Sequence, residues 1–167
     1  MPLDWTAWEI EPGSAVDEQL IAQVQQRLGV EFPALYLELV QYAEAATPGI
    51  GGFAYGGGYT CISEFFEFGL SNQPWTLLWY ASPGRVPGLA TGCLPIARDA
   101  GGLLICLDFN SPGVAVEIFD PESARRYSVA ADFKAFVELW QPCTRQAKGK
   151  SDPPAPVPHP PCVFTRA

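Results

Sequence analysis

The sequence predicts a single α+β domain in which a mostly antiparallel β-sheet packs against helices. Two helical segments with one apolar face each lie early in the chain, within residues 14–43. Three short apolar runs separated by turn residues follow within residues 93–119, and a last helical stripe lies within residues 133–140. Grouped strands flanked by helices are typical of α+β proteins. The domain is expected to span residues 1–142, which is long enough to bury one core.

The first predicted helix follows Ser14, because Asp17 comes three residues later and this pairing caps helix N-termini. Apolar residues then recur with helical spacing from residue 16 to residue 28, and Gly29 supplies the stop. A second helix is expected to start at Pro33, where the missing N–H costs nothing, and to run to Ala43. The two segments predict a helical pair.

The strands are predicted mainly in the second half of the chain. Residues 47–59 are too rich in glycine for a helix and predict a loop that enters a strand within residues 59–70. Residues 75–80 fit either a strand or a short helix. Residues 93–97 and 103–108 flank the turn Asp99-Ala100-Gly101-Gly102 and predict a hairpin, followed by strands over residues 114–119 and 126–129. Apolar residues at positions 133, 136, 137 and 140 predict the final helix.

Residues 143–167 are rich in proline and are expected to form a flexible tail. This tail holds the only histidine, His159. Nucleophilic catalysis by a Ser-His-Asp or Cys-His arrangement needs a histidine that packing holds in place. The folded part is therefore expected not to be an enzyme of either kind.

Catalysis by a pair of carboxylates is a weaker alternative. Glu64 with Glu67, or Asp108 with Asp120, would have to serve as acid and base. Asp108, however, ends a predicted strand and is expected to accept hydrogen bonds from turn amides. We therefore expect no catalytic residue.

The five cysteines are widely spaced and form no C-x-x-C pair. With a single histidine in the chain they do not match a zinc site, and the carboxylates show no spacing typical of a calcium site. The sequence predicts buried free thiols, no metal and no cofactor.

The predicted domain is strongly acidic. Through Pro142 it holds 6 Lys and Arg residues against 17 Asp and Glu residues, a net charge of −11. Such a surface repels nucleic acid and attracts a basic protein. No apolar run approaches the roughly 20 residues of a membrane span, and residues 1–11 lack the pattern of a secretory signal. We expect a cytoplasmic protein that binds neither nucleic acid nor membrane.

A set of short segments keeps a fixed order along the chain. They are Leu28-Gly29-Val30-Glu31-Phe32-Pro33 with Tyr36 and Leu39, Leu94-Pro95-Ile96-Ala97, Asp99-Ala100-Gly101-Gly102, Ile105-Cys106-Leu107-Asp108, and Phe133 with Phe136 before Leu139. Over residues 15–140 their order and spacing resemble the SUKH superfamily, which includes fungal cell-wall regulators and many bacterial immunity proteins. One departure is Glu44-Ala45-Ala46-Thr47-Pro48-Gly49, which stands where the family often has Asn-Gly.

The resemblance implies a protein that binds a partner without catalysis. In bacterial members the partner is typically the toxic domain of an effector, so the chain is expected to be an immunity protein for a cognate toxin. A basic nuclease is one candidate, since an acidic inhibitor is steered towards it. Aromatic anchors with acidic support are expected to bind it, although core burial competes as an explanation for each ring. The candidates are Trp75, Trp79, Tyr80, Glu64, Glu67 and Asp99.

A scaffold or regulatory module is the alternative function. In that case the proline-rich tail would recruit a groove that reads extended proline helices. The oligomeric state stays open, because an exposed edge strand or aromatic patch would serve a homodimer equally well.

Overall fold

The computed structural model describes residues 2–143 and confirms the α+β class. The predicted tail lies outside the described residues, apart from Cys143. None of the described helices is long and apolar enough to cross a membrane. The elements are η1 (Trp5–Trp8), α1 (Glu18–Leu28), α2 (Ala34–Tyr42), β1 (Gly52–Tyr55), β2 (Gly58–Phe65), α3 (Leu77–Ala81), β3 (Cys93–Asp99), β4 (Leu104–Asp108), β5 (Ala115–Asp120), β6 (Arg125–Ala130) and α4 (Phe133–Glu138).

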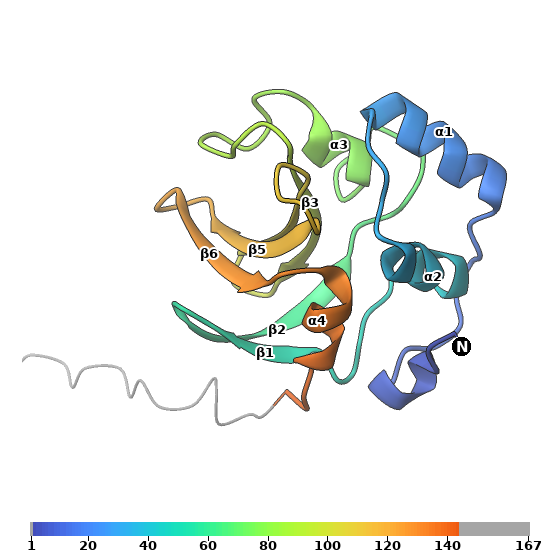
Figure 1. Cartoon of the computed structure of the whole chain (residues 1–167), viewed down its shortest axis with the longest axis horizontal. Coiled ribbons are helices and arrows are strands. Elements are labelled where there is room, and N and C mark those ends of the chain that lie inside the picture. Colours follow the sequence, from blue (N-terminus) through green and yellow to red (C-terminus); the bar gives the residue numbers. More distant parts are fainter. Residues whose placement is uncertain (1, 144–167) are drawn as a thin grey trace, which may run out of the picture.

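The six strands form one antiparallel sheet in which each strand pairs with the next along the chain. The sheet curls until its first and last strands touch, where the rings of Tyr55 and Tyr127 lie 5.3 Å apart. Figure 1 shows the nearly barrel-shaped sheet with α4 between it and α2. The predicted meander, edge strand and final helix are therefore confirmed.

The two faces of the sheet pack against different elements. Along β4, Ile105 and Leu107 belong to the main core under the helices, whereas Leu104 and Cys106 belong to a smaller cluster. This alternation is expected of a strand whose side chains point to opposite faces. Tyr80 at the end of α3 and the loop that follows cover the smaller cluster. The position of α3 is thus fixed by packing on the outer face.

The first helix starts later than its predicted cap. Asp17, not Ser14, is the N-cap, and its carboxylate accepts a hydrogen bond from the Leu20 N–H at 2.7 Å. The carbonyl of Ser14 instead accepts from the Glu44 N–H at 3.1 Å, which holds the segment before the helix against the end of α2. The stop at Gly29 is confirmed, because its φ of 67° is in the left-handed region that glycine tolerates.

The prediction of a loop over residues 47–59 was wrong, because this segment contains β1 and the turn into β2. Gly52 exchanges backbone hydrogen bonds with Gln141 at 2.9 and 2.8 Å. A side chain at Gly52 would collide with the Tyr59 hydroxyl and the Gln141 carbonyl. Glycine here allows close approach of the chain that follows α4, so pairing with β2 and with Gln141 forms the strand despite its low intrinsic propensity.

The prediction of five free thiols was wrong for two cysteines. Cys61 on β2 forms a disulfide with Cys143, whereas Cys93 and Cys106 are buried free thiols as predicted. The fifth cysteine lies outside the described residues. A sequence separation of 82 residues hides the pairing, because only the fold brings the chain end back to β2.

Candidate functional site

Trp75 is a large aromatic residue whose side chain is exposed to solvent. Its side chain is 52% exposed, and its φ of 72° is rare for a bulky residue. The Glu67 N–H donates to the Trp75 carbonyl at 3.1 Å, and the Leu77 N–H donates to the Glu67 carbonyl at 2.9 Å. Strained residues that their surroundings hold in place cluster at binding and active sites. Trp75 is therefore a candidate for such a role.

Arg98 on β3 links Trp75 to the sheet. Its guanidinium carbon lies 4.4 Å from the centre of the Trp75 ring, and its Nε donates to the Glu64 carboxylate at 2.8 Å. Glu64 and Arg98 are opposite each other in the register of β2 and β3. Sequence reasoning missed Arg98 because its 34-residue separation from Glu64 carries no signal until that register is known.

Trp79 and Tyr80 extend the aromatic surface along α3. Tyr80 stacks on Phe66 with ring centres 4.0 Å apart, and Trp79 meets the Tyr80 ring edge-on at 4.8 Å. The Arg85 guanidinium lies over the Trp79 ring at 4.3 Å. The side chains of Trp79 and Tyr80 are both half-buried. Core packing therefore explains the ring face of Tyr80 that stacks on Phe66, but not the exposed parts of the two rings.

A groove runs beside Trp75. It has a volume of about 380 Å³ and is lined by Ala45, Glu64, Phe65, Glu67, Trp75 and Arg98. We call Glu64, Glu67, Trp75, Trp79 and Tyr80, together with this groove, the aromatic face. Five of the six predicted partner-binding residues therefore lie together.

The groove carries uncompensated negative charge. Burial, and then the charge of Glu67, raises the pKa of Glu44, while a hydrogen bond from the Phe68 backbone acts in the opposite direction. Within residues 2–143, neither Glu44 nor Glu67 forms an ion pair. Two such carboxylates near one another favour a bound cation.

Asp99 has a different role from the other predicted residues. It is 6% exposed, and one carboxylate oxygen accepts from the N–H groups of Gly101 and Leu103 at 2.9 and 2.8 Å. Its second oxygen accepts from the Thr60 hydroxyl at 2.7 Å. Asp99 therefore closes the turn between β3 and β4, and these bonds occupy both of its oxygens.

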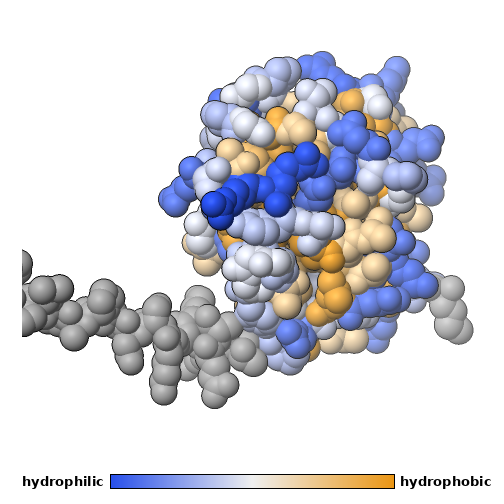
Figure 2. All heavy atoms as spheres, turned by 60° about the vertical axis from the view of Figure 1, so that its left-hand side comes forward, coloured by the Kyte–Doolittle hydropathy of each residue, from blue (hydrophilic) through white to orange (hydrophobic). Residues whose placement is uncertain are grey.

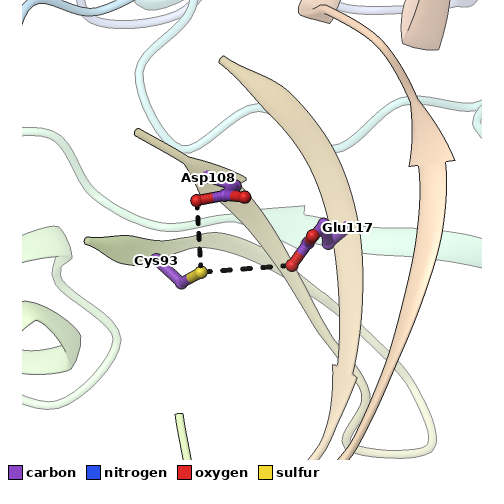
Figure 3. A group of neighbouring side chains, drawn as sticks. All are labelled: Cys93, Asp108 and Glu117. Atoms are coloured by element: carbon purple, nitrogen blue, oxygen red, sulfur yellow. Dashed lines mark hydrogen bonds between the residues drawn. The ribbon is translucent and has the colours of Figure 1, made fainter. Parts of the chain in front are cut away.

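A second group of polar side chains projects from β3, β4 and β5. Cys93, Asp108 and Glu117 point towards one another (Figure 3), with the thiol sulfur 3.6 Å from Asp108 and 4.0 Å from Glu117. Burial, and then the charge of Asp108, raises the pKa of Cys93 to about 11. The thiol is therefore protonated at neutral pH and is a poor nucleophile.

Arg126 on β6 supplies the positive charge for this group. Its Nη2 lies 2.7 Å from Glu117 and 3.7 Å from Asp108. The thiol and the two carboxylates are close enough to share a metal ion, but the Arg126 guanidinium already pairs with both carboxylates. We interpret the group as a structural ion network. Sequence reasoning missed it because four strands contribute one residue each.

Asp108 and Asp120, which were considered as a catalytic pair, do not lie opposite each other in the sheet. Asp108 is opposite Ala115 at the start of β5, whereas Asp120 ends that strand. Asp108 also accepts from the Asn110 N–H at 2.9 Å, as predicted for a turn.

Apolar side chains also reach the surface outside the aromatic face. Figure 2 shows one face of the molecule, on which hydrophobic patches are interrupted by hydrophilic side chains. Besides Trp75, only Leu70 and Leu139 are large exposed hydrophobic residues within residues 2–143.

Comparison with known proteins confirms the resemblance. The family model described as SMI1 / KNR4 family (SUKH-1) matches residues 15–139. This range contains the aromatic face and the ion network of Cys93. No curated protein matches the chain.

Proposed function

Because the chain belongs to the SMI1/KNR4 (SUKH-1) family, we propose that it is an immunity protein that binds a cognate bacterial toxin and neutralises it by occlusion. The family includes such proteins. The observation that carries the proposal is the aromatic face, where Trp75 is exposed while its carbonyl accepts a backbone hydrogen bond from Glu67. Rigid, exposed aromatic side chains are the residues that most often dominate the binding energy of protein interfaces.

Charge supports a basic partner. The net charge of −11 through Pro142 would speed the encounter with a basic toxin such as a nuclease. The same charge disfavours binding of the chain itself to nucleic acid. Occlusion of a nuclease by this face would compete directly with its substrate, because both partners would use the same basic surface.

We propose that the protein acts without catalysis. Glu64 is paired with Arg98, and Asp108 at the end of β4 is opposite Ala115 at the start of β5, whereas Asp120 ends β5. The raised pKa of Cys93 does not favour nucleophilic chemistry. Stoichiometric binding needs none of these groups to react.

We place this action in the cytoplasm, where a delivered toxin would meet its target. Because that compartment keeps most thiols reduced, neutralisation must then work without the bond between Cys61 and Cys143. A chain that ends at Cys143 should also neutralise the toxin, because the aromatic face lies within residues 44–98.

Expression of the neighbouring open reading frame in a bacterial host, with and without this chain, tests the proposal. We expect growth arrest by the neighbour alone, and we expect growth and a co-purifying complex when both are expressed. A neighbour that arrests growth equally in the presence of the chain would contradict the proposal.

A further inference from the structure

We infer that the groove beside Trp75 receives one lysine or arginine side chain of the partner, with its cationic group against Glu67 and its stem along the indole. The identity of the partner as a toxin rests on the proposed function, but the recognition of a basic side chain does not.

The shape of the groove suits a long side chain. Trp75 and Glu67 lie on its border, and Phe65 and Ala45 contribute apolar surface. A volume of about 380 Å³ leaves room for such a side chain while Arg98 stays in place. Lysine and arginine bury their hydrocarbon stems on apolar surface and keep the charge at the polar end.

Arg98 is a cation of the protein itself that already contacts an indole and a carboxylate at this groove. Its guanidinium lies over the Trp75 ring at 4.4 Å and bonds Glu64 at 2.8 Å. A second cation would find the Glu67 carboxylate on the same groove as the Trp75 indole, and Glu67 has no ion pair within residues 2–143. Contact of the hydrocarbon stem with the indole and a charge-assisted hydrogen bond to Glu67 would then act together.

Glu44 strengthens the preference for positive charge. The pKa of its carboxyl is raised by burial and then by the charge of Glu67, so a cation near both would relieve their repulsion. A neutral or acidic side chain would gain nothing from this. The backbone hydrogen bond from Glu67 to Trp75 holds the two segments together before binding, which lowers the ordering cost of association.

Nuclear magnetic resonance titration of the full chain with blocked peptides tests the inference without any toxin. The probes are acetyl-Gly-Arg-Gly-amide, its lysine counterpart and its citrulline counterpart, which is nearly isosteric with the arginine peptide but neutral. We expect saturable shifts of the Trp75 indole N–H and of the Glu67 and Ala45 amides with the two cationic peptides only. Equal shifts with the citrulline peptide would overturn the inference.

A matched pair of variants separates the groove from bulk charge. Glu67→Gln should weaken binding of the arginine peptide about fivefold, whereas Glu122→Gln, which removes an exposed charge between β5 and β6, should leave it unchanged. Glu44→Gln should also weaken binding of the arginine peptide, because it removes a negative charge. It should keep the fold, because that charge is repelled by Glu67 in the free protein. Equal weakening by Glu67→Gln and Glu122→Gln would overturn the inference.

These results are independent of the growth assay. Specific peptide binding by a chain that fails to rescue growth would support the groove and contradict the immunity function. Rescue of growth by a chain whose groove ignores the cationic peptides would support the immunity function and overturn this inference.

Discussion

Tyr36 carries a polar group in the centre of the core. Its side chain is fully buried, and its ring packs against Phe32 and Phe133 with centres 5.2 and 5.5 Å apart. No residue within 2–143 offers its hydroxyl a hydrogen bond, and burial raises its pKa far above the usual range. An unpaired hydroxyl in an apolar core costs free energy.

Tyr36→Phe is therefore expected to raise the free energy of unfolding by about 1 kcal/mol. Tyr42→Phe is the matched control, because the Tyr42 hydroxyl donates to the Ile10 carbonyl at 3.1 Å, and it should lower that free energy by about 1 kcal/mol. Urea denaturation of both variants measures the difference. A loss of stability in Tyr36→Phe would show that the hydroxyl has a partner.

Arg126 forms ion pairs with two carboxylates beside the Cys93 thiol. The hydrogen bond that Arg126 donates to Glu117 raises the pKa of Arg126, and the guanidinium also lies 3.5 Å from the Cys93 sulfur. Arg126→Ala should cost about 1 kcal/mol of folding stability, because it leaves Glu117 and Asp108 uncompensated while the site stays partly open to water.

Arg125→Ala serves as the control for Arg126→Ala. Arg125 is the exposed neighbour without an ion pair within residues 2–143, and its loss should change stability by less than about 0.5 kcal/mol. Thermal unfolding of both variants gives the comparison. Equal losses would mean that the ion network contributes nothing.

The acidic residues show how far a sequence allows roles to be assigned. Glu67 and Asp99 were both predicted to support partner binding. Glu67 is exposed beside the groove, whereas Asp99 is 6% exposed and bonded within its turn. The turn Asp99-Ala100-Gly101-Gly102 already favoured a local role for its aspartate, but the surroundings of Glu67 depend on a backbone pairing with Trp75 that no spacing reveals.

At the scale of elements, sequence patterns predicted the helices and strands that are formed by contacts between nearby residues. The final helix and the β3–β4 hairpin follow from apolar periodicity and a turn sequence. β1 was not predicted because the glycines within and around it lower strand propensity, and because its Gly52 bonds to the distant Gln141. The disulfide was not predicted because Cys61 and Cys143 are distant in sequence.

The bond between Cys61 and Cys143 closes a long loop and should stabilise the fold by restricting the unfolded chain. With a separation of 82 residues, Cys61→Ser should cost up to about 4 kcal/mol in guanidinium denaturation without reductant. Adding reductant to the wild type should produce the same loss. Unchanged stability of the wild type in reductant would contradict a formed bond. Toxin binding by the folded variant should persist, because neither cysteine lines the groove.

At the scale of the whole molecule, the order of short segments predicted the family, and the match over residues 15–139 confirmed it. An acidic domain without a histidine in its first 142 residues favours binding over catalysis. The aromatic face could be located only from the structure, because α3 is placed by packing on Phe66 and its neighbours, which periodicity does not encode.

Isothermal titration calorimetry of the purified chain against the neighbouring toxin domain is the most direct measurement of partner binding through the aromatic face. The Trp75→Ala variant is compared with Leu139→Ala, which removes a side chain of similar exposure, 44% against 52%, next to α4. We expect saturable binding by the wild type and by Leu139→Ala, and at least about tenfold weaker binding by Trp75→Ala. Equal affinity of the Trp75→Ala variant and the wild type would contradict binding through this face.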